Sequence, residues 1–232
     1  MLSQKSLARS GALREIIVVG YQNYDFAKSL VVGEIIYEDF CLDLRGFEAL
    51  IFTSKNAILS LEENAKKHSQ MQEWKQKPSY VIGRGSAKVL QNLGGNLAYI
   101  SPNSHGKEFA TLLQHTLSPQ TSLLYLRAKN IISNLDETLK NAGFSIHSQI
   151  AYHSSPLSLK NSQKPPKNSI LLFTSPSAYA YFLQNFQWDS SYLAVGIGKS
   201  TFESFESGIK KEISPIQEIE KSIKLLQSRL GV

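Results

Sequence analysis

The sequence predicts an α/β protein with parallel sheets, organised as two related halves. Short apolar segments alternate with amphipathic ones along most of its 232 residues, which is typical of parallel strands covered by helices on both faces. A set of short motifs also occurs twice, in the same order. A hydrophobic content of 42% supports a packed core, and the length suits one large domain or two small ones.

In the first half, each expected strand is followed by an expected helix. The strand at 15–19 precedes a short helix that ends near Leu30. Further strands are expected at 48–52, at 79–82, in "NLAYI" and in "SLLYL". The helices after them are expected in "SKNAILSLEENAKKH", "GSAKVLQNL", "GKEFATLLQHTL" and "ISNLDETLKNAG". Two glycines at 94–95 end the second of these helices, and Gly143 ends the last.

The second half follows a polar loop at 160–168 and repeats motifs of the first. Strands in "SILLF" and "YLAVG" alternate with helices in "SAYAYFLQNF" and "KSTFESF". "LIFTSKNAILSL" (50–61) matches "LLFTSPSAYAYF" (171–182), and "YVIGRGSAKVL" (80–90) matches "VGIGKSTFESF" (195–205). Each half therefore has two strand–helix corners, one with Thr-Ser and one with glycine and a basic residue.

These four corners have two interpretations. A hydroxyl at the start of a helix can cap free backbone N–H groups, which fully explains a single corner. Four corners in two copies also predict a binding site, because ligands of open α/β sheets bind beyond the carboxyl ends of the strands. The corner at Gly198-Lys199 is not a P-loop, since that pattern requires a glycine where this chain has Leu193. Its helix start suits an anion other than a nucleoside triphosphate.

Composition narrows the class of partner. The formal net charge of +6 favours anionic partners, although it is equally typical of a protein that is simply basic. The basic residues are spread along the chain, which argues against a nucleic-acid-binding arm. Cys41 lies between Phe40 and Leu42, so we expect a buried small hydrophobe rather than a nucleophile. The histidines show no metal-ligand spacing, and no apolar run suits a membrane span or a signal peptide, so we expect no metal and a cytoplasmic protein.

The paired FTS corners, the GxxT-like corners and the tyrosine of "IAYHSSP" resemble the uroporphyrinogen-III synthase family over about residues 14–230. The resemblance implies two α/β/α domains joined by a two-stranded linker, with a cleft between the domains. Residues 1–13 have no counterpart in the family pattern, so we expect disorder or an overlong start there. The implied parts are a discontinuous domain of 1–34 and 154–232, an inserted domain of 40–148, and linker strands at 35–39 and 149–153.

The resemblance also implies a reaction. The family closes hydroxymethylbilane, a linear tetrapyrrole with eight carboxylates, to uroporphyrinogen III with inversion of the terminal pyrrole ring and loss of water. It needs no cofactor and no metal. The expected partner is thus a small polycarboxylate, without nucleic acid or membrane. We further expect a monomer and a transient contact with the enzyme that makes hydroxymethylbilane. A two-lobed binding module or sensor for an anionic metabolite, without catalysis, is the alternative.

Expected substrate-binding residues occupy the corners and one strand end. Arg127, at the end of "LLYLR", can pair with a carboxylate or lie solvated in its loop. Arg84 and Lys199 hold equivalent places in the repeat and are expected to attract anions weakly. The family has proline and a basic residue after FTS, where this chain has Lys55-Asn56; no substrate contact is carried over to Gly20-Tyr21, where the family has Thr-Arg. The full set is Thr53, Ser54, Asn56, Gly83, Arg84, Ser86, Arg127, Ser175, Ser177, Gly198, Lys199, Ser200 and Thr201.

Tyr152 is the expected catalytic residue, because it matches the tyrosine of the family's second linker segment. A phenol there can donate a proton or a hydrogen bond to the departing hydroxyl group. The alternative is an aromatic side chain that packs the linker. His153 is a poor candidate, since neighbouring residues on a strand point to opposite faces.

Overall fold

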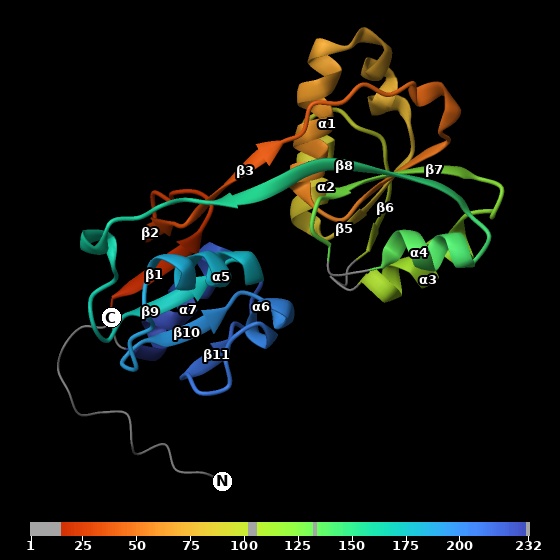
Figure 1. The fold of residues 1–232 in the computed structure, drawn as a ribbon. Helices are drawn as coiled ribbons and strands as arrows, with labels where there is room; N and C mark the ends of the chain where they lie inside the picture. The colour runs from red at the N-terminus through yellow and green to blue at the C-terminus, as the bar shows by residue number, and fades with distance from the viewer. Residues whose placement is uncertain (1–14, 102–105, 132–133, 231–232) are drawn as a thin grey trace. The chain divides into compact units, whose positions relative to one another are not determined.

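The computed structural model describes residues 15–101, 106–131 and 134–230, and these fold into two compact units (Figure 1). The discontinuous unit holds the described residues up to Glu34 and those from Ser154 onwards, and the inserted unit is Ile35–His153. The predicted linker segments 35–39 and 149–153 belong to the inserted unit in this division. The expectation for residues 1–13 falls outside the described residues.

The discontinuous unit is built on a five-stranded sheet in the order β11-β10-β9-β1-β2, in which neighbouring strands are parallel. Its strands are β1 (Ile16–Gly20), β2 (Lys28–Val31), β9 (Ile170–Phe173), β10 (Leu193–Gly196) and β11 (Lys211–Ile213). β1 pairs with β9 from Ile16↔Ile170 to Val19↔Phe173, so distant parts of the chain share one sheet. Nearly continuous burial of "IIVVG" and "ILLF" suits central parallel strands covered on both faces.

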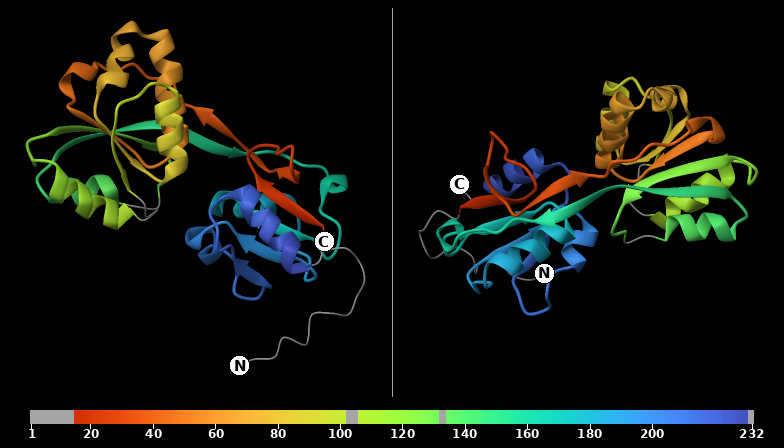
Figure 2. Two further views of the ribbon diagram at one scale, coloured as in Figure 1. Left: turned by 180° about the vertical axis from the view of Figure 1, so that it is seen from behind. Right: turned by 45° about the horizontal axis from the view of Figure 1, so that its top comes forward.

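Helices cover both faces of this sheet, as two views of the ribbon show (Figure 2). The helices are α5 (Pro176–Asn185), α6 (Lys199–Glu203) and α7 (Ile219–Leu230). Phe173 packs with Phe182 of α5 and with Phe205 just after α6 on one face. On the other face, Leu172 packs with Ile223 of α7. The unit is therefore a three-layer α/β/α sandwich, held together on one side by a group of edge-to-face aromatic rings.

The inserted unit has a six-stranded sheet in the order β3-β8-β7-β4-β5-β6. Its strands are β3 (Gly33–Tyr37), β4 (Ala49–Phe52), β5 (Ser79–Ile82), β6 (Leu97–Ser101), β7 (Ser122–Ala128) and β8 (Ser145–Pro156). α1 (Lys55–Lys67) and α2 (Arg84–Asn92) pack on one face, and α3 (Gly106–Thr116) and α4 (Leu135–Asn141) on the other. The neighbouring strands from β8 through β7, β4 and β5 to β6 are parallel, so this unit has the same three-layer architecture.

The strands β3 and β8 carry the chain between the two units. The backbone N–H of Glu38 donates to Ala151 O at 2.9 Å, and that of Leu157 donates to Val32 O at 3.0 Å. The residue numbers rise on one strand as they fall on the other, so the two strands run antiparallel.

One expected helix is wrong. The segment after β1 forms no helix, and residues Lys28–Val31 are the parallel strand β2, paired with β1. Leu30 and Val32 are buried and Val31 between them is half-buried, an alternation that suits a strand and not a helix. The sequence prediction also missed β11 and α7, which complete the discontinuous unit.

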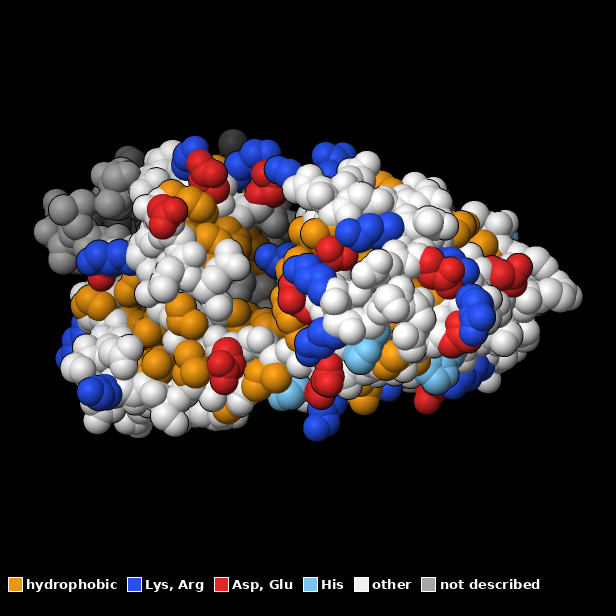
Figure 3. All heavy atoms as spheres, turned by 90° about the horizontal axis from the view of Figure 1, so that it is seen from above, with side chains coloured by type: hydrophobic (Ala, Val, Ile, Leu, Met, Phe, Trp, Pro, Cys, Tyr) orange, Lys and Arg blue, Asp and Glu red, His pale blue; other side chains and the backbone are white. Residues whose placement is uncertain are grey.

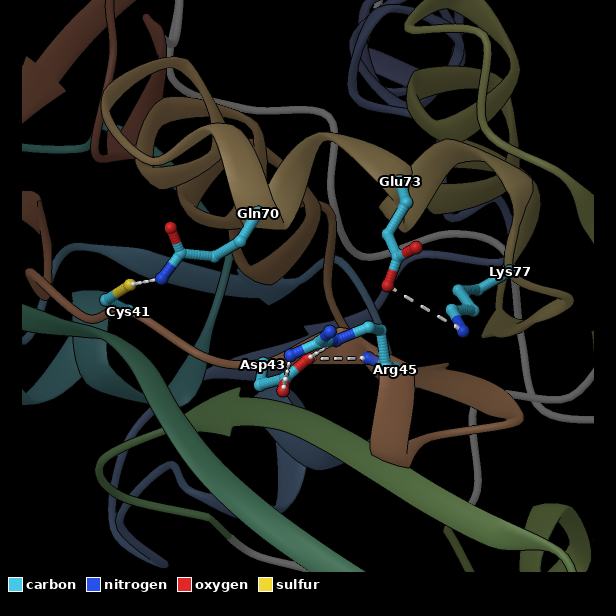
Figure 4. A network of polar contacts seen from close by, with 6 residues as sticks. All are labelled: Cys41, Asp43, Arg45, Gln70, Glu73 and Lys77. Atoms are coloured by element: carbon cyan, nitrogen blue, oxygen red, sulfur yellow. Dashed lines mark hydrogen bonds and ion pairs between the residues drawn. The ribbon is translucent and has the colours of Figure 1, made fainter.

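Cys41 also differs from the expectation, because it is exposed. The side chain of the preceding residue, Phe40, is buried, so these two neighbours differ in exposure. Gln70 Nε2 donates to Cys41 Sγ at 2.9 Å, as Figure 4 shows. Beside it, both oxygens of Asp43 accept from the Arg45 side chain, at 2.9 and 2.7 Å.

Candidate functional site

In the discontinuous unit, the carboxyl ends of three parallel strands form one edge, called here the discontinuous-unit edge. Phe173 of β9 is level with Gly196 of β10, and Val19 of β1 is level with Phe173. The segments that follow these strands therefore lie at the same edge of the sheet. Tyr21 follows β1, Ser175 follows β9, and Gly198 follows β10.

The FTS corner of this edge is a capped helix start with linked hydroxyls. Ser175 is the N-cap of α5, and its Oγ accepts from the backbone N–H of Ala178 at 3.1 Å. Proline at 176 suits the first helical position, where no backbone N–H is needed. Ser177 Oγ lies 3.2 Å from Ser175 Oγ and accepts from Tyr21 Oη at 2.6 Å. Three hydroxyl groups thus form one chain at this edge.

The second corner of this edge presents small and basic residues. A Cβ on Gly196 would lie 2.7 Å from the backbone nitrogen of Phe202, so only glycine lets α6 start this close to β10. Lys199 and Ser200 are exposed, and Lys199 Nζ lies 3.7 Å from Glu203 Oε1 in a surface pair that contributes little. Thr201 is only 2% exposed, so its side chain belongs to the core.

The corresponding edge of the inserted unit, called the inserted-unit edge, lies at the carboxyl ends of β4, β5 and β7. Ser54 is the N-cap of α1, and its Oγ accepts from the backbone N–H of Asn56 at 3.2 Å. Thr53 Oγ1 lies 3.1 Å from Tyr125 Oη, a fully buried phenol on β7. Burial raises the pKa of Tyr125 above its ordinary value, so this phenol is protonated at neutral pH.

The second corner of this edge depends on backbone conformation. Gly83 has φ 79° and ψ 146°, a region that essentially only glycine adopts. Its N–H donates to Ser101 O at 3.0 Å, and α2 begins at the next residue. Arg84 is exposed, whereas Ser86 is 9% exposed and lies against the core.

Arg127 follows the buried part of β7 and turns toward its own loop. Its Nη1 donates to Ala128 O at 2.9 Å and to Lys129 O at 3.3 Å, and its Nε lies 3.8 Å from Asp136 Oδ2. The side chains of Arg127 and Asp136 are 19% and 13% exposed. Ser148 Oγ donates to the same Asp136 oxygen at 2.9 Å. Of the two interpretations, a solvated loop arginine does not fit this geometry, because the guanidinium is mostly buried and bonded.

Tyr152 lies on β8 opposite Ala128, after a register shift that follows Arg127. Its ring is half-buried against the core cluster that includes α1. The residue before it is held on two sides, because Ala151 O accepts from Ser60 Oγ at 2.5 Å and from the Glu38 N–H at 2.9 Å. His153 Nδ1 lies 2.6 Å from Glu38 Oε1, so the neighbouring imidazole pairs with the residue that directly follows β3.

Charge is mixed over the visible surface. Figure 3 shows Lys and Arg side chains interspersed with Asp and Glu over the face that it presents. Each candidate edge has one exposed cation next to its glycine corner, Arg84 in one unit and Lys199 in the other. Within residues 15–101, 106–131 and 134–230, no three His, Cys, Asp or Glu side chains are grouped so that they could hold a metal ion. None of the helices in these ranges is long and apolar enough to cross a membrane.

Comparison with known proteins decides the family. The family model for "Uroporphyrinogen-III synthase HemD" matches residues 34–223. The chain belongs to the uroporphyrinogen-III synthase family. It is 34% identical to the crystal structure of uroporphyrinogen-III synthetase from Helicobacter pylori 26695, with a TM-score of 0.78, and the match covers 94% of this chain and 100% of that one.

More distant structures share the fold. Two crystal structures of uroporphyrinogen III synthase from Thermus thermophilus match 94% of this chain. The mutant form has a TM-score of 0.62 at 12% identity over 99% of its chain, and the wild-type form has 0.51 at 14% identity over 97%. The curated proteins contain no significant match to this sequence.

Membership in the uroporphyrinogen-III synthase family confirms the predicted fold class and the predicted activity. The chain is a cofactor-independent cyclising lyase of porphyrin biosynthesis that converts hydroxymethylbilane to uroporphyrinogen III. Nothing supports the alternative of a binding module without catalysis. Polar side chains at the candidate edges that the sequence prediction did not select include Tyr125, beside Thr53, and Tyr21. For Tyr21 a signal was available. Its position directly after β1, like that of Ser175 after β9, was the available signal.

Proposed function

We propose that this uroporphyrinogen-III synthase binds the carboxylates of hydroxymethylbilane at both strand-end edges. The observation that carries the proposal is the gathering of hydroxyls and helix starts at the same edge of each parallel sheet. Backbone N–H groups at helix starts and neutral hydroxyls suit carboxylates, and the net charge of +6 attracts an octacarboxylate over a longer range.

We assign roles to the predicted site residues according to the exposure of their side chains. Thr53, Ser177 and Ser200 are placed to contact the ligand directly, together with Ser54, Asn56 and Ser175 at the helix starts. Ser86 and Thr201 are buried, so we assign them the support of the helix starts whose N–H groups face the ligand. Gly83 and Gly198 allow close approach of backbone, Arg84 and Lys199 supply weak attraction, and Arg127 orders the loop after β7.

We assign Tyr152 as the hydrogen-bond or proton donor to the departing hydroxyl group. The C–O bond of the hydroxymethyl group breaks, the electron-rich pyrrole supplies the electron pair, and the hydroxyl leaves as water after protonation. A phenol with a pKa near 10 is protonated at neutral pH and can donate without a large shift. The difficult step is closure with the terminal ring inverted, which the shape of the bound substrate controls.

Tyr152→Phe tests this assignment. We expect kcat to fall about a hundredfold, with a smaller change in KM, because general-acid assistance is lost while binding is kept. The product should still be isomer III. A wild-type kcat would remove Tyr152 from the mechanism. Normal consumption with isomer I as product would instead assign it to ring inversion.

The activity itself is tested with freshly made hydroxymethylbilane and chromatographic separation of the product isomers. Spontaneous closure gives isomer I, so isomer III reports the enzyme. Heat-inactivated protein is the control. Formation of isomer I alone, at the spontaneous rate, would contradict the proposed function.

We propose a monomeric, cytoplasmic enzyme that contacts the enzyme supplying hydroxymethylbilane only transiently, and linker strands at 35–39 and 149–153. Light scattering on the purified chain measures the monomer directly, and a dimer mass at micromolar concentration would contradict it.

A further inference from the structure

We propose that Tyr21 is a positioning residue for the substrate, acting through the hydroxyl of Ser177 at the discontinuous-unit edge. This rests on the proposed function, in which Ser177 contacts a substrate carboxylate. The sequence carried no substrate contact to Tyr21, and the structure places it beside the FTS corner instead.

The ring of Tyr21 is held in place by its packing contacts. It meets Tyr181 edge-on, with centroids 6.3 Å apart and planes at 88°. A Cβ on Gly33 would lie 2.9 Å from Tyr21 Cε1 and 2.7 Å from Tyr181 Cδ2, so both rings pack directly against the backbone of that glycine. Tyr181 is fixed in turn, because its Oη donates to Ser154 O at 2.9 Å. The Tyr21 phenol is therefore oriented before any ligand binds.

The direction of the hydrogen bond between Tyr21 and Ser177 leaves the Ser177 proton available to a ligand. Tyr21 Oη donates to Ser177 Oγ at 2.6 Å, which occupies one acceptor site of that serine and leaves its own proton available. A hydroxyl that accepts from a phenol is polarised and becomes a stronger donor. Without ligand, the Ser177 proton can be shared with Ser175 Oγ at 3.2 Å. A carboxylate at this edge would accept the same proton in a shorter, charge-assisted bond.

These three neutral hydroxyl groups can orient a substrate carboxylate although none of them carries a formal charge. Ser175 Oγ accepts from the Ala178 N–H, so its position is fixed by the capping of α5. Ser177 is held instead by the hydrogen bond from Tyr21, which sets the direction in which the Ser177 proton points. The inference is that Tyr21 and Ser177 bind one substrate carboxylate as a coupled pair.

A double-mutant cycle tests the coupling, with Tyr21→Phe, Ser177→Ala and both together. Initial rates of isomer III formation, corrected for spontaneous closure, give kcat and KM. We expect Tyr21→Phe to raise KM about three- to tenfold with kcat within twofold, and Ser177→Ala to raise KM about ten- to hundredfold. The double variant should match Ser177→Ala, because the two changes remove the same interaction.

Tyr24→Phe is the matched control, since it removes a phenol from the same segment in a ring that packs on Phe26 instead. Melting temperatures of all variants separate loss of folding from loss of binding. An unchanged KM in Tyr21→Phe, with Ser177→Ala impaired, would overturn the inference and leave the proposed function intact. An unchanged KM in Ser177→Ala would instead refute carboxylate binding at this corner. Additive effects in the double variant would also overturn the coupling.

Discussion

The two strand-end edges share a motif but use their polar atoms differently. At the discontinuous-unit edge, Tyr21, Ser177 and Ser175 bond to one another, so their polar atoms stay together at the edge of the sheet. At the inserted-unit edge, Thr53 is bonded to the buried Tyr125 and Arg127 to the carbonyls of its own loop. Repeated sequence therefore does not imply repeated chemistry. Under the proposed function, the polar atoms of the first edge serve mainly the ligand, whereas those of the second edge also stabilise the fold.

This contrast gives opposite expectations for the two units. Substitutions at the inserted-unit edge should lower the free energy of unfolding together with binding. Substitutions of the equivalent residues at the discontinuous-unit edge should affect binding more than stability. The following changes test that difference.

The largest stability effect is expected from Arg127→Ala. The change leaves two carbonyls without their donor and Asp136 without its nearby cation, and hydrogen bonds from a charged group are worth about 1.5–3 kcal/mol. We expect unfolding in urea to show a loss of about 2 kcal/mol. The exposed Lys129→Ala is the control. An unchanged urea midpoint with a raised KM would make Arg127 a direct substrate ligand and erase the contrast.

The two glycine corners give the next comparison. Gly83→Ala places a side chain at φ 79°, which costs about 1–3 kcal/mol although no atom stands in the way. Gly198 has φ −155°, an ordinary extended conformation, and its Cβ would meet only Gln217 at 3.4 Å. We therefore expect Gly198→Ala to leave the free energy of unfolding nearly unchanged. Equal losses in the two variants would show that backbone conformation does not distinguish the corners.

Removal of the two N-cap hydroxyls should change the free energy of unfolding by similar amounts in the two units. Ser54→Ala and Ser175→Ala each remove one capping hydrogen bond, worth about 1 kcal/mol. Ser175 also lies beside the proposed carboxylate-binding hydroxyl, so its variant should raise KM more than the Ser54 variant does. Chemical denaturation and KM measured on the same samples give both quantities. A larger KM effect from Ser54→Ala would reverse the assignment of the ligand-facing edge.

The smallest effect concerns the exposed pair Asp43–Arg45, which contrasts with the mostly buried Arg127–Asp136 pair. Hydrogen bonds from Arg45 lower the pKa of Asp43 to about 2 from an ordinary 3.8. A carboxyl whose pKa is lowered by folding contributes stability above about pH 4, and the contribution disappears as the pH falls toward 2. Arg45→Ala should return the Asp43 pKa toward 3.8 in a carbon-13 NMR titration. Asp39, whose pKa is lowered by Lys67, is the internal reference.

The sequence predicted the positions of most elements because their signals are local. The repeat at 50–61 and 171–182 located β4 with α1 and β9 with α5, since the apolar periodicity and the capping serine lie within one short window. The segment after β1 was misread because its two buried residues are too few to separate a strand from a helix. The exposure of Cys41 was missed because the apolar residues on either side of it do not reveal which way its own side chain faces.

The hydrogen-bond partners of the site residues could not be predicted from the sequence, because they lie far apart along the chain. Tyr21 and Ser177 are separated by 156 positions, and Thr53 and Tyr125 by 72. Such pairs follow from strand order and register, which no local pattern specifies. Likewise, the position of Arg127 at a strand end was readable from the sequence, but only the structure shows that its guanidinium bonds to Ala128 and Lys129.

The pairing of β1 between β2 and β9 has a consequence for synthesis of the chain. Ile16 is level with Ile170, so β1 lacks one of its two neighbours until about 150 more residues have been translated. At roughly 5–20 residues per second, this interval lasts about 8–30 seconds. All strands from β4 to β7 and their helices emerge within that interval and can form a core of their own. During synthesis, one edge of the apolar segment "IIVV" therefore stays without its native partner strand for that whole interval.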